Sequence, residues 1–152
     1  MAEFGIADYL AVQRLVHLYP RLLDAGDLEG VGRLFDHATV HFEGRPEPVE
    51  RDAAEITAMF RAFLKLYDGS PRTRHLICNL IVEPLGPAAA TATSTVVVVQ
   101  AAPGLPLQPI ITGDYRDRFE KAGRAWRFAE RRITNDLFGD LSAHGKYRLG
   151  PD

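Results

Sequence analysis

The sequence predicts an α+β domain in which helices cover one face of a curved antiparallel sheet. Apolar residues recur at helical spacing in the first half of the chain. The second half holds four long β-type runs, at residues 72–85, 88–101, 107–121 and 125–137. Short connections that contain Gly and Pro separate these runs, so neighbouring strands are expected to be antiparallel. Helices followed by a meander of strands are typical of the α+β class.

Helices are expected in the first half at residues 6–24, 28–35 and 52–69, with a short strand at 39–42. Pro20 interrupts the first helix, and a kink is expected there because proline removes a backbone donor and crowds the preceding turn. Gly26 suits a left-handed helix end. Asp27 and Asp52 suit the first turns of the next two helices, because their carboxylates can accept from free backbone N–H groups.

Length and composition predict a single domain over residues 1–152, with a core at about 6–138 and a C-terminal tail at 139–152. The formal net charge is −2 and the basic residues are dispersed, which argues against nucleic acid and acidic membranes as partners. A small hydrophobic molecule is the expected partner. The N-terminus lacks the features of a signal peptide and no stretch is long enough to span a bilayer, so a cytoplasmic location is expected.

No metal or other cofactor is expected. Cys78 is the only cysteine, which excludes an internal disulfide and a cysteine-rich zinc site. Apart from His75, the histidines show no metal-ligand spacing with a carboxylate; they are His17, His37, His41 and His144. The sequence also has no glycine-rich phosphate loop and no Gly-x-Ser-x-Gly elbow.

The run from Arg72 to Glu83 is the most informative stretch. It is apolar on both faces, as expected for a strand that packs on one side and lines a pocket on the other. Strand alternation places His75 and Asn79 on the same face. We therefore expect this face to line a ligand-binding cone, with His75 as its acid/base group.

Four stretches then carry a resemblance: 19–35, the triplet Thr73-Arg74-His75, 113–119 and 126–142. In this order and spacing they resemble the SnoaL-like branch of the nuclear transport factor 2-like superfamily, over residues 6–144. The resemblance implies a cone of curved antiparallel sheet closed by three helices, with a pocket in its mouth. It implies no single function, because this fold hosts many.

Within the superfamily the chain looks most similar to cofactor-independent dehydratases, which include scytalone dehydratase and the bile-acid dehydratases. Their pockets use an Asp at the end of the first long helix and a His on the first long strand, which Asp24 and His75 match. Bile-acid dehydratases also place a Tyr five residues before that Asp, as Tyr19 stands here. The chain departs from the pattern at residues 93–100, where the family has an Asp or His and this strand offers only Gln100.

The resemblance and general chemistry together suggest roles for these groups. His75 is the expected acid/base, Asp24 would fix its tautomer, and Tyr19 would donate to the substrate oxygen. Tyr19 and Asp24 lie roughly 140° apart on an ideal helix, so they meet only if Pro20 bends the helix or Asp24 lies at its frayed end. Further residues expected to bind substrate are Asn79, Tyr115, Gln100, Phe60 and Arg132, the last on the interior face with Trp126 and Phe128.

The leading hypothesis is a lyase or isomerase of the dehydratase type that acts on a hydrophobic cyclic substrate such as a steroid or polyketide. The alternatives are a non-catalytic ligand-binding or assembly domain, a polyketide cyclase, and a small subunit of a ring-hydroxylating dioxygenase. The sheet is too apolar on its outer face for one chain to cover, as the run Val96–Val99 illustrates. A homodimer or homotrimer built through the sheet is therefore expected.

Overall fold

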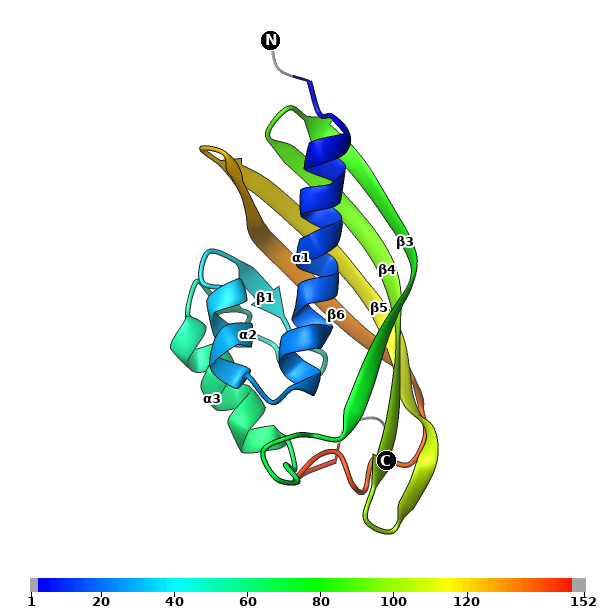
Figure 1. Ribbon diagram of the computed structural model, residues 1–152. Helices are drawn as coiled ribbons and strands as arrows, with labels where there is room; N and C mark the ends of the chain where they lie inside the picture. Colours follow the sequence, from blue (N-terminus) through cyan, green and yellow to red (C-terminus); the bar gives the residue numbers. More distant parts are fainter. Residues whose placement is uncertain (1–2, 149–152) are drawn as a thin grey trace.

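Helices lie against one face of a single curved sheet in the computed structural model, which describes residues 3–148 (Figure 1). The helices are α1 (Ile6–Asp24), α2 (Leu28–Leu34) and α3 (Ala53–Phe63). The strands are β1 (Thr39–His41), β2 (Val49–Glu50), β3 (Thr73–Gly86), β4 (Ala89–Ala102), β5 (Leu105–Ala122) and β6 (Ala125–Phe138). Their order is β2-β1-β6-β5-β4-β3, so the sheet does not close on itself. The predicted α+β cone is confirmed.

The four long strands form the predicted antiparallel meander, each starting and ending within about two residues of the run that predicted it. The sheet is nevertheless mixed, because β1 pairs with β6 in parallel. β2 was not predicted; two residues long, it pairs with β1 at the other edge of the sheet. The short strands extend the curved sheet beneath α2 and α3 (Figure 1).

The helix ends follow the predicted capping groups. α1 is continuous through Pro20, and Gly26 beyond it has the left-handed φ of 79°. The carboxylates of Asp27 and Asp52 each accept a hydrogen bond, at 2.9 Å, from the backbone N–H three residues further on. The third helix ends at Phe63 rather than near residue 69, because Leu64 turns to an extended conformation and forms a β-bridge with Gly145.

The core lies between α1 and the inner face of the sheet. α1 buries Val12, Val16, Tyr19 and Leu23 there, at the three- and four-residue spacing that predicted the helix. At the narrow end of the cone, Asp8 of α1 accepts hydrogen bonds from Lys121 and from the indole of Trp126, both at 2.8 Å. These two hydrogen bonds hold the first turn of α1 against the hairpin between β5 and β6.

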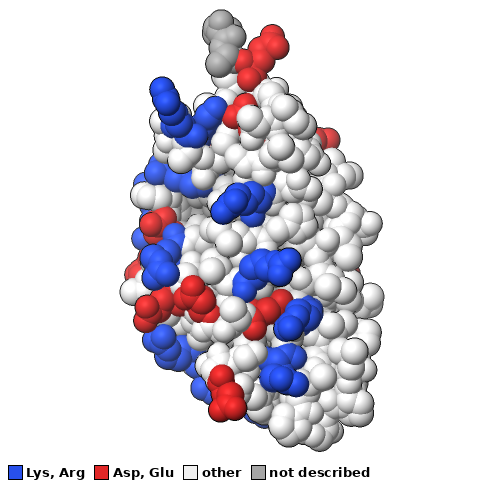
Figure 2. All heavy atoms as spheres, viewed as in Figure 1, with Lys and Arg blue, Asp and Glu red and all other residues white. Residues whose placement is uncertain are grey.

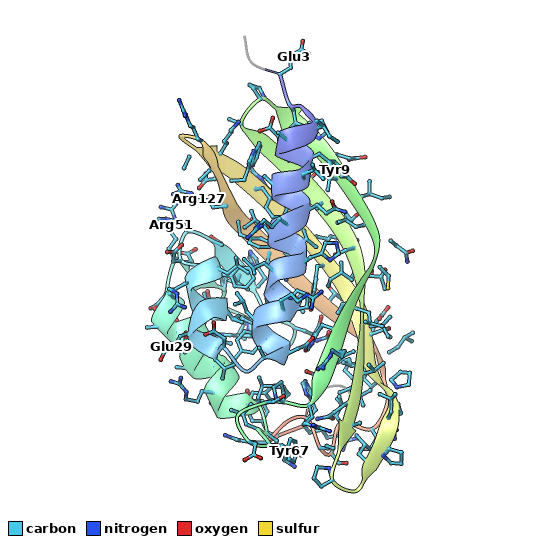
Figure 3. All side chains as sticks on the ribbon, in the orientation of Figure 1. Glu3, Tyr9, Glu29, Arg51, Tyr67 and Arg127 are labelled. Atoms are coloured by element: carbon cyan, nitrogen blue, oxygen red, sulfur yellow. The ribbon has the colours of Figure 1, made fainter. Side chains whose placement is uncertain are left out.

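The segment 139–148 folds back against the open end of the cone. The backbone N–H of Lys65 donates to the carbonyl of His144 at 2.9 Å. The hydroxyl of Tyr67, at the end of the molecule away from the N-terminus in Figure 3, donates to the carbonyl of Ala143 at 2.7 Å. The predicted tail is therefore part of the packed structure as far as it is described; residues 149–152 lie outside the described range.

Basic and acidic side chains are interspersed over the helical face of the molecule, with few along the margin formed by β3 and β4 (Figure 2). This face presents no continuous field of one sign. Within residues 3–148, no helix combines the length and the apolar character that crossing a bilayer requires.

Candidate active site

Asp24 is the last residue of α1, and its side chain reaches β3. The carboxylate accepts from the Thr73 hydroxyl at 2.7 Å and from the backbone N–H of His75 at 2.9 Å. Burial disfavours its charge, but the hydrogen bonds and charge of His75, with the bond from Thr73, outweigh that effect and lower the pKa of Asp24. A carboxylate anion is therefore anchored at the junction of α1 and β3.

The imidazole of His75 completes a pair with this carboxylate. Its Nδ1 lies 2.6 Å from Oδ1 of Asp24, and the two side chains are only 7% and 11% exposed. Because a carboxylate accepts and cannot donate, Nδ1 carries the proton in this pair. The second ring nitrogen, Nε2, is then the one available to a ligand. Asp24 thus fixes both the orientation and the tautomer of His75.

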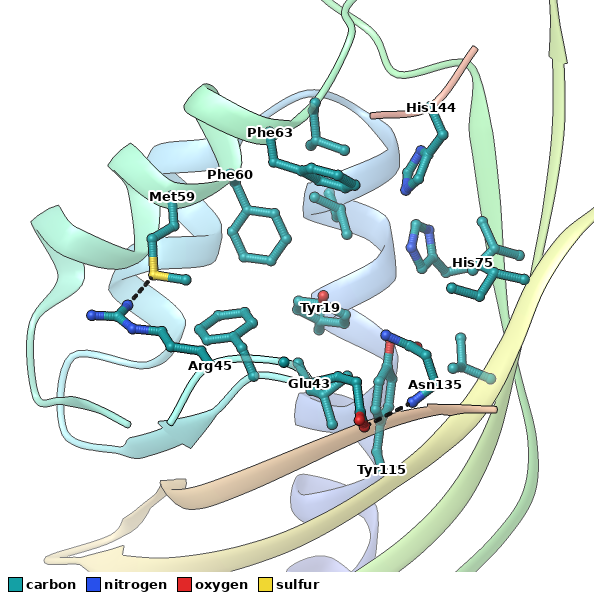
Figure 4. A pocket seen from close by; sticks show the side chains of 18 of the residues that line it. Tyr19, Glu43, Arg45, Met59, Phe60, Phe63, His75, Tyr115, Asn135 and His144 are labelled. Carbon is teal, nitrogen blue, oxygen red and sulfur yellow. Dashed lines mark hydrogen bonds between the residues drawn. The ribbon is translucent and has the colours of Figure 1, made fainter. Parts of the chain in front are cut away.

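A cavity of about 400 Å³ opens beside His75 (Figure 4). This exceeds the roughly 300 Å³ at which small-molecule sites begin. α1 contributes Tyr19 and α3 contributes Phe60, while the sheet contributes mainly aliphatic side chains such as Val96 and Ile133. The walls are therefore mostly apolar, with a small number of polar groups near the dyad. Glu43 lies beside Asn135 in Figure 4 and accepts a hydrogen bond from the backbone N–H of Asn135 at 3.3 Å.

Tyr19 lines the cavity next to His75, with its ring centroid 6.3 Å from that of His75. Asp24 ends α1, so its side chain reaches His75 from the helix terminus although α1 does not break at Pro20. Burial is the main cause that raises the pKa of Tyr19 to about 12. The hydroxyl therefore keeps its proton and remains a hydrogen-bond donor at physiological pH.

The buried guanidinium of Arg131 packs against the rings of two tyrosines, Tyr19 and Tyr115. Arg131 is fully buried and forms a two-bond ion pair with Asp117, with both N–O distances at 2.8 Å. Its guanidinium lies 4.7 Å from the Tyr19 ring centroid and 4.0 Å from that of Tyr115. Such stacking orients aromatic rings and opposes the effect of burial on their hydroxyls. Arg131 is a positioning residue that sequence reasoning left outside the site.

A second imidazole, that of His144, also lines the cavity. It enters from the segment 139–148, and its ring points toward His75 in Figure 4. His144 is 7% exposed, and its Nδ1 is buried without a hydrogen-bond partner. β4 carries no acid or imidazole at residues 93–100, and the second imidazole of the pocket comes from the segment 139–148 instead. The sequence showed His144 only as a histidine without metal-ligand spacing.

Five of the residues singled out from the sequence meet at this cavity. Tyr19, His75, Phe60 and Tyr115 line it, and Asp24 supports His75 from behind. Their catalytic and binding roles remain predictions. Gln100, Asn79 and Arg132 are not among the residues that line the cavity.

Gln100 is buried inside the fold rather than at the cavity wall. Its side-chain N–H₂ donates to the carbonyls of Pro71 and Ala143, at 2.9 and 3.0 Å. The position at the cavity expected for Gln100 is not found, because the segment 139–148 engages its side chain. Gln100 instead ties that segment to β4.

Asn79 is exposed because β3 contains a bulge. Its φ is 53°, and the register with β4 shifts between Cys78 and Ile81. One extra residue in a strand reverses the faces of every residue that follows. The alternation of side chains between the two faces of β3 is therefore broken at Asn79, which does not share the face of His75.

Arg132 is exposed and bonds to Glu130, while its neighbour Arg131 is the buried arginine. The register between β5 and β6 shifts between Arg118 and Phe119. This bulge places Arg131 on the interior face that Trp126 and Phe128 also occupy. The prediction for Arg132 was wrong by one position for this reason.

The SnoaL-like domain family model matches residues 5–132. The chain belongs to this family. The match contains Tyr19, Asp24 and His75, whereas His144 lies beyond it. The comparison with curated proteins found no match.

Solved structures with the same fold include an aspartate-to-asparagine variant of a Mycobacterium tuberculosis protein of unknown function. It is 28% identical with a TM-score of 0.70, and the alignment covers 87% of this chain and 78% of that one. A Novosphingobium aromaticivorans protein named "Putative Scytalone Dehydratase" is 17% identical, with a TM-score of 0.72 and coverages of 95% and 91%. An NTF2-like protein with a cystatin-like fold from the same bacterium is 21% identical, with a TM-score of 0.70 and coverages of 91% and 87%.

Residues 3–148 are the part of the chain that the structure describes, and their acidic, histidine and cysteine side chains are dispersed with respect to metal binding. No group of three or more His, Cys, Asp or Glu side chains in that range could hold a metal ion. The imidazole of His75 and the hydroxyl of Tyr19 are groups that can take part in proton transfer and hydrogen bonding at the cavity.

Proposed function

We propose that the chain is a cofactor-independent lyase or isomerase of the dehydratase type, acting by acid/base catalysis on a hydrophobic cyclic substrate of steroid or polyketide type. The observation that supports this most is the buried His75–Asp24 pair at the wall of a largely apolar cavity of about 400 Å³. Imidazole is the side chain that enzymes use most often for proton transfer. An apolar cavity suits a cyclic substrate and strengthens each polar contact made inside it.

The elimination of water from a β-hydroxy ketone illustrates the proposed roles. Nε2 of His75 removes a proton from the carbon between the carbonyl and the hydroxyl-bearing carbon. Tyr19 donates a hydrogen bond to the carbonyl oxygen as negative charge develops there, which its raised pKa permits. The carbon–oxygen bond then breaks, and the leaving hydroxide takes the proton back from His75 and departs as water.

Asp24 has a supporting role in this scheme. It accepts from Nδ1 of His75 and so keeps Nε2 free as the base. The positive charge that His75 gains during proton transfer lies 2.6 Å from the carboxylate, which stabilises it. Membership of the SnoaL-like family, and the shared fold of a protein named as a scytalone dehydratase, are consistent with this reaction class.

A bicyclic test substrate checks the proposal. 3-Hydroxy-1-tetralone loses water to give 1-naphthol, whose absorbance reports the rate directly. We expect His75→Ala and Asp24→Asn each to lower kcat/KM by at least about 100-fold, since general acid/base groups contribute roughly 10²–10⁴. His37→Ala, at an exposed histidine that does not line the cavity, is the control and should leave the rate unchanged.

A folded His75→Ala protein that keeps the full rate would remove His75 from its assigned role. Binding of 1-naphthol without any turnover of the tetralone would favour a ligand-binding domain of the same fold. Circular dichroism and thermal unfolding of each variant separate loss of chemistry from loss of fold.

A further inference from the structure

We propose that His144 is a second substrate-contacting residue, whose uncharged imidazole binds an oxygen on an apolar cyclic ligand opposite His75. The pocket would then select a cyclic alcohol, phenol or enol over the hydrocarbon of the same shape. This inference deepens the proposed function, because it names the chemical feature by which that site recognises its substrate.

The first observation is an unmet hydrogen-bonding group. Nδ1 of His144 is buried and has no partner within the described structure. A ligand at Nε2 leaves this atom unpaired, so its importance here is that nothing in the described structure holds the ring proton at Nδ1. No protein group fixes the tautomer of His144, in contrast to His75, whose Nδ1 proton is held by Asp24.

The second observation is the position of the ring. His144 lines the cavity, and the tip of its imidazole, where Nε2 lies, points toward His75 (Figure 4). Because the tautomer is free, Nε2 can donate to a carbonyl oxygen or accept from a hydroxyl group. An oxygen between the two imidazoles can therefore be bound in either the ketone or the enol state of a substrate.

The third observation is that the ring is held in place before any ligand arrives. Phe63 packs edge-on against it, with ring centroids 5.5 Å apart. The backbone of His144 is fixed on both sides, by the N–H of Lys65 donating to its carbonyl and by its own N–H donating to Leu141. Preorganised contacts of this kind improve binding because little order is lost on association.

Charge also favours this role. Burial, with a smaller effect from His75, lowers the pKa of His144 to about 4, although Asp24 acts in the opposite sense. The ring is therefore neutral when His75 takes up a proton, and the two imidazoles do not repel each other. A neutral imidazole is a suitable partner for an oxygen whose charge changes during proton transfer.

The test compares two ligands that differ only in one oxygen, 1-naphthol and naphthalene. We expect the wild-type protein to bind 1-naphthol at least about tenfold more tightly, as measured by isothermal titration or equilibrium dialysis. His144→Phe keeps a ring against Phe63 and should reduce this preference to less than about threefold. His144→Gln, which retains a donor and an acceptor, should preserve most of it, and His37→Phe should leave it intact.

A second measurement requires no variant. In ¹⁵N NMR spectra, the ring nitrogens of His144 should shift on addition of 1-naphthol and stay unchanged with naphthalene, while the exposed His17 and His37 provide internal references. Equal binding of the two ligands by the wild type, an undiminished preference in His144→Phe, or an unmoved His144 signal would overturn the inference.

These outcomes are independent of turnover. Loss of the oxygen preference in His144→Phe, combined with no dehydration by the wild type, would uphold the inference and refute the proposed chemistry. Dehydration that depends on His75 but not on His144, with the oxygen preference retained in His144→Phe, would uphold the proposed chemistry and refute the inference.

Discussion

At the scale of single residues, the two imidazoles of the pocket differ in what surrounds them. His75 has a carboxylate partner at 2.6 Å, and His144 has none on its buried Nδ1. The same residue type therefore takes a fixed tautomer in one position and an unfixed, uncharged ring in the other. In the proposed scheme, this difference lets the two imidazoles contact one substrate in different ways.

The lowered pKa of His144 predicts a specific loss of stability in acid. Its folded-state pKa of about 4 lies below the ordinary 6.5, so between these values the unfolded chain binds the extra proton and the native state does not. Stability is thus fully present above pH 6.5 and falls as the pH drops toward 4. From pH 7 to pH 5 this residue should contribute a loss of about 2 kcal/mol.

Urea unfolding of the wild type and of His144→Gln at the two pH values measures this contribution. The variant's free energy of unfolding should decline less between pH 7 and pH 5, by about that amount. His37→Gln serves as the exposed control and should behave as the wild type does. The groups that face His144 are His75 and Asp24, and an identical decline in wild type and His144→Gln would assign the acid sensitivity to that pair instead.

At the scale of elements, the end of α1 depends on a close backbone approach. Gly26 has a φ of 79°, and a Cβ placed there would lie 1.8 Å from the carbonyl oxygen of Gly69. Gly104 has nearly the same φ, 80°, but open space around it. Both glycines avoid the cost of about 1–2 kcal/mol that an L side chain meets in this conformation, and only Gly26 also avoids a backbone clash.

Alanine at these two positions separates the two effects. Gly104→Ala should lower the free energy of unfolding by about 1 kcal/mol, and Gly26→Ala by at least about 2 kcal/mol more. Because Gly26 follows the helix that ends in Asp24, Gly26→Ala should also weaken binding of 1-naphthol. Equal effects of the two substitutions in thermal unfolding would show that α1 and residue 69 separate easily.

The sequence predicted the long elements well and the bulges not at all. Long apolar runs separated by Gly- and Pro-containing turns locate β3 to β6 almost to the residue, because each signal is local. The single extra residues near Asn79 and before Arg131 leave no local signal, yet each reverses the faces of a strand. His75 was singled out from the pattern of its strand and Asp24 through a family resemblance, whereas His144 reaches the pocket only through the tertiary path of 139–148.

At the scale of the whole molecule, the outer face of the sheet remains the predicted site of self-association. The cross-strand partners Leu76, Val97, Thr112 and Leu137 form one outward row across β3, β4, β5 and β6. Leu76 is 48% exposed and Leu137 is 64% exposed. An aligned apolar row of this kind is well suited to pack against a second copy of the same sheet.

Charge placed in this row should disrupt the assembly. We expect the wild type to be a dimer or trimer in light scattering coupled to gel filtration, and the double variant Leu76→Lys with Leu137→Lys to be a monomer. Ile6→Lys changes an exposed apolar residue on α1 and should leave the oligomer intact. A monomeric wild type at micromolar concentration would refute the prediction.

The segment 139–148 is held against the cone by hydrogen bonds from Lys65, Tyr67 and Gln100. It begins after the end of the family match at residue 132. In a fold arranged in this way, the side chains that this segment brings to the cavity can change while the rest of the fold stays the same. A different segment after β6, held by the same backbone hydrogen bonds, would bring a different side chain to the cavity while the His75–Asp24 pair stays in place. The polar groups of the cavity could then change without any change in the core.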